Sequence, residues 1–262
     1  MINRKLAFVI PSVFALAFFT CDSAQAALLF GVNLIQNPGA EAGLGAPTNN
    51  IVEPVPNWTT TAGNFTAVQY TTLPMSVPRL TDPGPVNRGV NLFAGGTNPN
   101  PDAPAFLSIG EQLQDVSNVA GLIDTGLVPY TLSAYLGGYF DQRDNAMFTA
   151  IFENAGMASL GSTTIGPVLL ADRFDPNVGY SVTGLFPRSA TGLIPMGTRT
   201  IDFKLVLTGI DGHQDDGYAD NLSFIATDPG GPAVPEPGSI GMLGAGLCAI
   251  GLARRFRRRA TR

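Results

Sequence analysis

Short apolar runs, separated by turn-forming residues, recur along the middle of the chain. In residues 201–207 apolar side chains alternate with Asp202 and Lys204 before the run becomes continuously apolar, which is typical of a half-buried strand that becomes fully buried. No stretch of this region carries apolar residues at helical spacing. Similar β-prone runs cover residues 65–70, 90–93, 106–113, 130–139, 146–152, 180–186, 200–208 and 218–225.

Turn chemistry separates these runs, as in Gly137-Gly138 and Asp211-Gly212. Many short strands with turn-rich connections predict an all-β fold, either a sandwich or a barrel. No self-similarity at a fixed spacing is present, so a solenoid or a propeller is not expected.

The N-terminus has the three-part layout of a secretion signal. Arg4 and Lys5 precede an apolar run over residues 6–19, and the small residues of Ala24-Gln25-Ala26 follow. The run is shorter than the roughly 20 residues that cross a bilayer comfortably. We therefore predict a signal peptide over residues 1–26; an uncleaved N-terminal anchor and a lipoprotein modified at Cys21 are the alternatives.

The C-terminus has a matching plan. Pro235, Glu236 and Pro237 precede an uncharged apolar stretch over residues 238–253. As a helix this stretch is about 24 Å long, so we predict a single transmembrane helix that thins the bilayer locally. A basic tail follows and favours the cytoplasmic side, which leaves the body facing outward: Arg254, Arg255, Arg257, Arg258 and Arg259.

The order of Pro-Glu-Pro, apolar helix and arginine cluster resembles the PEP-CTERM domain of Gram-negative bacteria that make extracellular polysaccharide. The resemblance covers about the last 30 residues. It implies that an exosortase, a membrane cysteine protease, recognises Pro235, Glu236 and Pro237 and removes the tail. A plain C-terminal anchor after a proline-rich linker is the alternative.

These boundaries divide the chain into a signal peptide (1–26), a β-sandwich body (27–228), a Pro/Gly linker (229–237), a transmembrane helix (238–253) and a basic tail (254–262). Residues 27–233 hold seven basic and 18 acidic side chains, a net charge of about −11. Such a charge argues against nucleic acid as a partner and suits divalent cations. Both cysteines, Cys21 and Cys248, lie outside the body, which excludes disulfides and cysteine catalysis there.

Two segments narrow the fold. The body opens with residues 33–41, which end in Glu41, followed by Pro56-Asn57-Trp58, and it closes with Asp220-Asn221-Leu222-Ser223-Phe224. Together they resemble the galactose-binding-like jelly rolls found in many carbohydrate-binding modules, although Pro38 stands where that family has a glycine. The resemblance implies a jelly-roll β-sandwich with a structural calcium ion between Glu41 and Asp220. The alternative is that Glu41 is a surface turn residue and Asp220 bonds backbone amides.

The sequence holds little that indicates catalysis. His213 is the single histidine and lies in a polar loop, and no Gly-x-Ser-x-Gly elbow occurs. The acidic group Asp211, Asp215, Asp216 and Asp220 fails the EF-hand spacing, so we interpret it as a solvated hairpin tip. No catalytic residue is predicted.

Sugar binding needs an exposed aromatic face beside polar groups. Tyr139 precedes the polar turn Phe140–Asp144 and is the predicted ligand-binding residue, whereas Trp58 is expected to fill the core. We therefore predict an exported, exosortase-sorted surface or matrix protein that binds extracellular polysaccharide without catalysis. A structural matrix or adhesion protein without a small ligand, and a secreted hydrolase, are the alternatives.

Overall fold

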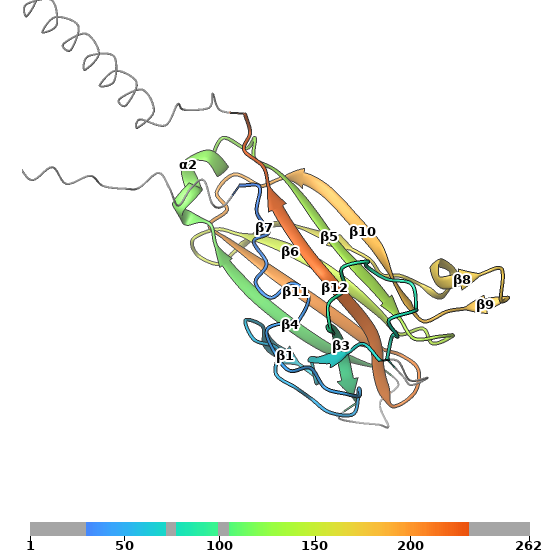
Figure 1. The fold of residues 1–262 in the computed structure, drawn as a ribbon. Coiled ribbons are helices and arrows are strands. Elements are labelled where there is room, and N and C mark those ends of the chain that lie inside the picture. The colour runs from blue at the N-terminus through green and yellow to red at the C-terminus, as the bar shows by residue number, and fades with distance from the viewer. Residues whose placement is uncertain (1–29, 72–76, 99–104, 231–262) are drawn as a thin grey trace, which may run out of the picture.

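The computed structural model describes residues 30–71, 77–98 and 105–230. Two five-stranded antiparallel sheets pack face to face (Figure 1). The first sheet has the order β1 (Thr59–Ala62), β4 (Phe106–Asp115), β11 (Thr200–Gly209), β6 (Asn145–Glu153) and β7 (Ser159–Ile165). The second has the order β10 (Gly184–Leu193), β5 (Pro129–Gly138), β12 (Gln214–Ala226), β3 (Asn91–Thr97) and β2 (Thr66–Gln69). The predicted jelly-roll sandwich is confirmed.

The remaining elements are short. A two-stranded hairpin of β8 (Phe174–Asp175) and β9 (Tyr180–Ser181) projects from one end of the sandwich (Figure 1). The helical turns are η1 (Ser117–Val119), α2 (Ala120–Ile123) and η2 (Leu170–Arg173). Within the described ranges no helix is long and apolar enough to cross a membrane.

The main core lies between the sheets and follows the predicted alternation. Phe203 on β11 is fully buried, and its ring centroid lies 5.3 Å from that of Phe224 on β12 and 6.2 Å from that of Phe148 on β6. Trp58 packs against Phe93, as expected for a core residue. Because successive strand residues point to opposite faces, the residues between these core positions form the outer faces of the sheets.

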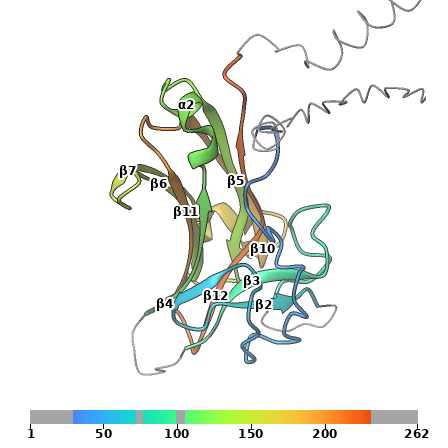
Figure 2. The same cartoon turned by 90° about the vertical axis from the view of Figure 1, so that its left-hand side faces the viewer.

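A second apolar cluster covers the outer face of the second sheet. Leu92 and Tyr218 point outward from β3 and β12 and pack with Val77 from the segment before β3. The backbone N–H of Leu185 donates to the carbonyl of Pro83 at 2.9 Å, which fixes this segment beside β10. Figure 2 shows the N-terminal segment and this loop on the same side of the molecule. The outer face of the first sheet lies on the opposite side.

Three details differ from the predictions. Gly137 and Gly138 lie inside β5 rather than in a turn. Position 137 requires glycine because a Cβ there would lie 1.8 Å from the carbonyl oxygen of Gly184 on the neighbouring strand. β1, β7 and the two-residue β8 were not predicted; the first two consist mostly of exposed Thr, Ser and Gly residues that show no apolar alternation. The run at residues 180–186 divides into β9 and the start of β10.

The opening segment does not form a regular strand. It meets β12 through isolated bridges, such as Asn33 with Ile225, and the Asn33 side chain substitutes for part of the ladder. Its Oδ1 accepts from the N–H of Ile35 and Phe224, and its Nδ2 donates to Leu222. The opening and closing segments therefore run side by side. The predicted signal peptide, PEP motif, transmembrane helix and basic tail lie outside the described residues.

Candidate functional site

The first candidate site is the corner where the opening and closing segments meet. Glu41 Oε1 accepts from the N–H of Val90 at 2.9 Å and of Asn91 at 2.8 Å. Asp220 Oδ2 accepts from the Tyr70 hydroxyl at 2.7 Å. A Cβ on Gly39 would lie 3.2 Å from Asp220 Oδ1 and 3.7 Å from Glu41 Cγ, so both predicted ligand residues flank the same piece of backbone.

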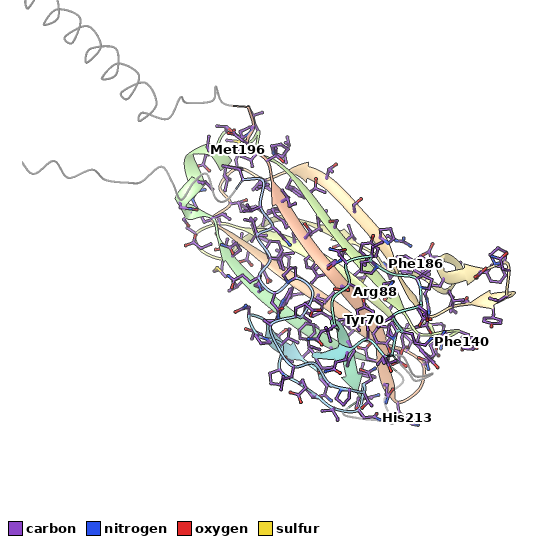
Figure 3. The ribbon with its side chains drawn as sticks, in the orientation of Figure 1. Tyr70, Arg88, Phe140, Phe186, Met196 and His213 are labelled. Atoms are coloured by element: carbon purple, nitrogen blue, oxygen red, sulfur yellow. The ribbon has the colours of Figure 1, made fainter. Side chains whose placement is uncertain are left out.

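Burial, and then the charge of Glu41, raise the pKa of Asp220 to about 7 against the lowering effect of the Tyr70 hydrogen bond. Arg88 also lowers this pKa; its guanidinium lies 5.2 Å from the centroid of the Tyr70 ring (Figure 3). Asp220 is buried, whereas Glu41 lies in an exposed turn. Two carboxylates beside one piece of backbone are chemically suited to a calcium ion, which takes six to eight oxygens. Calcium at Glu41 and Asp220 stays a prediction.

The acidic group near the β11–β12 connection is more buried than predicted. Asp215 and Asp216 are almost completely buried, whereas His213 is exposed as expected. Asp216 accepts from the Tyr218 hydroxyl and from Asn49, and Asp211 pairs with Arg143 at 2.6 Å. Across the described ranges no three His, Cys, Asp or Glu side chains are grouped closely enough to ligate one ion.

The second candidate site lies around Tyr139, at the end of β5. Tyr139 is partly buried and its ring lies 6.3 Å from that of Phe140, which lies 5.3 Å from the ring of Tyr180 on β9. Phe140 is 39% exposed and Tyr180 is 49% exposed. We call Tyr139, Phe140 and Tyr180 the aromatic tip. Sequence reasoning identified Tyr139 but missed the two more exposed rings, since their contact joins residues far apart in sequence.

The backbone holds the aromatic tip firmly. Phe140 has a φ of 39°, a left-handed conformation that is a genuine outlier for a bulky residue. Its N–H donates to Thr183 Oγ1 at 3.0 Å, and its carbonyl accepts from the buried Arg173 guanidinium at 2.8 Å. Arg173 also donates to the carbonyl of Gln142 and so ties this turn to the β8–β9 hairpin. Figure 3 shows Phe140 at that end of the sandwich.

The third candidate site is the outer face of the first sheet. Asp202 on β11 points to this face between Leu113 on β4 and Ile151 on β6, its register neighbours. It is only 8% exposed, and no described residue donates a hydrogen bond to its carboxylate. Glu153, two register positions away on β6 and on the same face, likewise has a buried Oε2 without a partner among the described residues. Most buried polar groups in native proteins are hydrogen-bonded, so these two carboxylate oxygens call for an explanation.

Burial and the neighbouring Glu111 raise the pKa of Asp202 to about 6, while Lys204 lowers it. Lys204 is itself committed to Glu111, with 2.6 Å between Nζ and Oε1. Sequence analysis placed Asp202 at an alternating polar position, which predicts its face but says nothing of its missing partners. Two hollows flank this face and share Leu113 in their lining, with volumes of about 400 and 340 Å³.

Comparison with known proteins concerns both the tail and the body. Residues 233–259 match the model of the PEP-CTERM protein-sorting motif. The chain ends in a PEP-CTERM sorting motif. The motif marks an exported protein that an exosortase processes, as the resemblance of Pro235, Glu236 and Pro237 implied. No curated protein sequence resembles the chain.

Solved structures that resemble the body of this chain have low sequence identity to it. TmCBM61, solved in complex with beta-1,4-galactotriose, has 13% identity and a TM-score of 0.40, over 74% of this chain and 99% of that chain. A cyclase from Fischerella sp. TAU has 11% identity and a TM-score of 0.48, over 76% and 98%. The enzymatically active domain of bacteriophage CBA120 tailspike protein 4 has 10% identity and a TM-score of 0.39, over 74% of this chain but only 21% of the tailspike chain. At these identities the similarity concerns the fold alone.

Proposed function

We propose that this PEP-CTERM protein is a non-catalytic surface or matrix component whose body binds extracellular polysaccharide through the aromatic tip. The observation that carries the proposal is the pair of exposed rings of Phe140 and Tyr180, 5.3 Å apart beside Tyr139. Two adjacent exposed rings on a rigid turn offer an apolar surface on which a partner can stack, which supports binding.

The chemistry of the tip suits a sugar chain. A pyranose ring presents an apolar face and a rim of hydroxyls, and it is bound by aromatic faces next to polar groups. Asp141 follows Phe140 directly and is exposed, and the exposed Asn177 lies in the hairpin that carries Tyr180. The Arg173 clamp keeps the rings in place without ligand, which lowers the entropy lost on binding.

The sorting signal supports the same conclusion. The PEP-CTERM motif resembles those of bacteria that make extracellular polysaccharide, so an exported body would meet such a polymer outside the cell. We propose that residues 238–253 span the inner membrane until an exosortase removes them, with the arginine tail on the cytoplasmic side. The mature body then lies outside the inner membrane, at the cell surface or in the extracellular space.

The proposed calcium ion has a structural role. Glu41 and Asp220 join the opening segment to β12, and a calcium ion between them would neutralise the buried Asp220 and the exposed Glu41, whose charges repel each other. Calcium would stabilise the sandwich edge and takes no part in sugar contact, because the aromatic tip lies on another loop.

Affinity electrophoresis of the purified full-length protein through gels containing single polysaccharides tests the function. We expect retardation on at least one polymer, and about a tenfold weaker affinity in Phe140→Ala and in Tyr180→Ala because each loses one stacking face. Leu193→Ala is the control, since Leu193 is an equally exposed apolar residue at the opposite end of β10. Unretarded migration of the unaltered protein on every polymer would rule the function out.

A further inference from the structure

The cations of the body are already engaged by the protein itself. Residues 27–233 hold seven Arg and Lys side chains, all of them in the described ranges. Two of them, Arg88 and Arg173, donate to backbone carbonyls. Five form ion pairs with carboxylates: Arg79–Asp82, Arg143–Asp211, Arg188–Asp172, Arg199–Asp124 and Lys204–Glu111. An anionic polymer would have to displace one of these internal contacts and meet a body charge of about −11.

The carboxylates on the outer face of the first sheet are in the opposite condition. Asp202 and Glu153 each keep a buried oxygen that receives no hydrogen bond from any described residue. A buried carboxylate without donors costs more than a neutral group in the same place. Asp202 lies between the apolar side chains of Leu113 and Ile151, so the sheet itself supplies no donor along that row.

The face also has room for an extended ligand. One hollow, of about 400 Å³, lies beside β1 and β4 and the other, of about 340 Å³, lies beside the ends of β4, β6 and β11. Both reach Leu113, the register neighbour of Asp202. Asp202 and Glu153 line neither hollow, so a chain that follows both would reach Asp202 where it crosses the face at Leu113.

We propose that the outer face of the first sheet binds the ammonium groups of an amine-bearing polysaccharide, with Asp202 and Glu153 as the acceptors. This inference rests on the proposed function, which supplies polysaccharide as the class of ligand. It adds a second contact surface, which favours polysaccharides with positively charged groups. An ammonium group supplies both the missing hydrogen-bond donors and the opposite charge, whereas a hydroxyl supplies only a donor. Two neighbouring carboxylates suffice to accept an ammonium group, which brings its own hydrogen-bond donors.

The affinity should depend on pH because both the Asp202 carboxylate and the amine of the ligand gain or lose a proton. The groups that face Asp202 come from three strands: Glu111 and Leu113 on β4, Thr149, Ile151 and Glu153 on β6, and Thr200 and Lys204 on β11. Because the pKa of Asp202 is raised to about 6, its negative charge is lost as the pH falls through that value. A primary amine with a pKa of roughly 8 loses its positive charge above it. Affinity should therefore be highest between these two values.

Isothermal titration of the purified full-length protein with an oligomer of glucosamine and with the N-acetylglucosamine oligomer of the same length and linkage tests the inference. We expect at least about tenfold tighter binding of the glucosamine oligomer, and loss of this preference in Asp202→Asn. Asp228→Asn removes one exposed carboxylate elsewhere and is the matched control, which should keep the preference. The melting temperature of Asp202→Asn should not fall, since no internal hydrogen bond is broken.

The outcomes separate this inference from the proposed function. Equal affinity for the two oligomers, or an unchanged preference in Asp202→Asn, overturns the proposed selection by charge. It does not contradict polysaccharide binding by the aromatic tip. Loss of binding to both oligomers in Phe140→Ala, with the preference unaffected by Asp202→Asn, would likewise overturn selection by Asp202 while supporting binding at the aromatic tip. A stabilisation by calcium alone that disappears in Asp202→Asn would show a metal site and also overturns it. Retention on no polysaccharide at all removes both proposals.

Discussion

Replacing Asp202 by Asn should stabilise the folded protein, and by an amount that depends on pH. Asp202 is 8% exposed and receives no hydrogen bond from the described residues, so its ionised form is disfavoured in the folded state. Burial and Glu111 raise its pKa from 3.8 to about 6, whereas in the unfolded chain it stays near 3.9. Asn has nearly the same shape and carries no charge, so the substitution removes this penalty.

The sign and size follow from proton linkage. A carboxyl whose folded pKa is raised binds its proton more tightly when folded, so stability is highest at low pH and falls as the pH rises from about 4 to about 6. The full shift corresponds to about 3 kcal/mol. The carboxylate is at an open sheet face, where solvent and Lys204 screen it, so we expect about 1–2 kcal/mol above pH 6. For a body of this size that is about 2–8 °C in melting temperature.

The assay is denaturant unfolding of the unaltered protein and of Asp202→Asn, at about pH 4 and at about pH 7.5. Taking the difference between the two proteins at each pH cancels other titrating groups, such as Asp216 and Asp220. We expect equal stability at the lower pH and a more stable variant at the higher one. Asp144→Asn is the contrasting control, because Asp144 accepts three backbone N–H groups and its replacement should destabilise at both values. A variant of Asp202 that is less stable at about pH 7.5 would refute the reasoning.

Two further predictions concern the corner and the tail. A calcium chelator should lower the melting temperature of the unaltered protein, and Asp220→Ala should remove this sensitivity; an unchanged melting temperature with chelator would contradict calcium binding at Glu41 and Asp220. Glu236→Ala should leave the chain uncut and retained in the membrane fraction, measured by immunoblotting of a C-terminal tag, while Glu53→Gln should be processed normally. Normal removal of the tail in Glu236→Ala would contradict recognition of the Pro-Glu-Pro motif.

Much of the fold could be predicted because apolar and polar residues alternate along strands that are buried on one face. Residues 201–207 showed this alternation and became β11, the central strand of the first sheet. β7 could not be predicted, since its Ser, Thr and Gly residues are mostly exposed and show no alternation of apolar and polar positions. The sequence predicted a turn at Gly137. In the structure this glycine allows β10 to approach β5 closely, and the sequence alone does not show that these two strands pair.

The candidate sites depend on contacts between distant parts of the chain. The convergence of Glu41 and Asp220 was predictable from the resemblance of two short segments, one near each end of the body. The aromatic tip was not, because Tyr180 reaches Phe140 through a hairpin whose position is set by the buried Arg173. A single sequence shows which aromatic residues exist, and it does not show which of their faces remain in solvent.

Asp144 and Asp202 show why burial of a carboxylate does not by itself reveal its role. Both belong to the sandwich and both have raised pKa values caused mainly by burial. The backbone N–H groups of Ile210, Asp211 and Asp216 satisfy Asp144, so it is explained by the fold that it stabilises. Asp202 receives nothing comparable, and we expect the fold to be more stable without its charge. Since proteins break local rules of stability mostly at functional or strained sites, the missing donors of Asp202 are the stronger indication of an external partner.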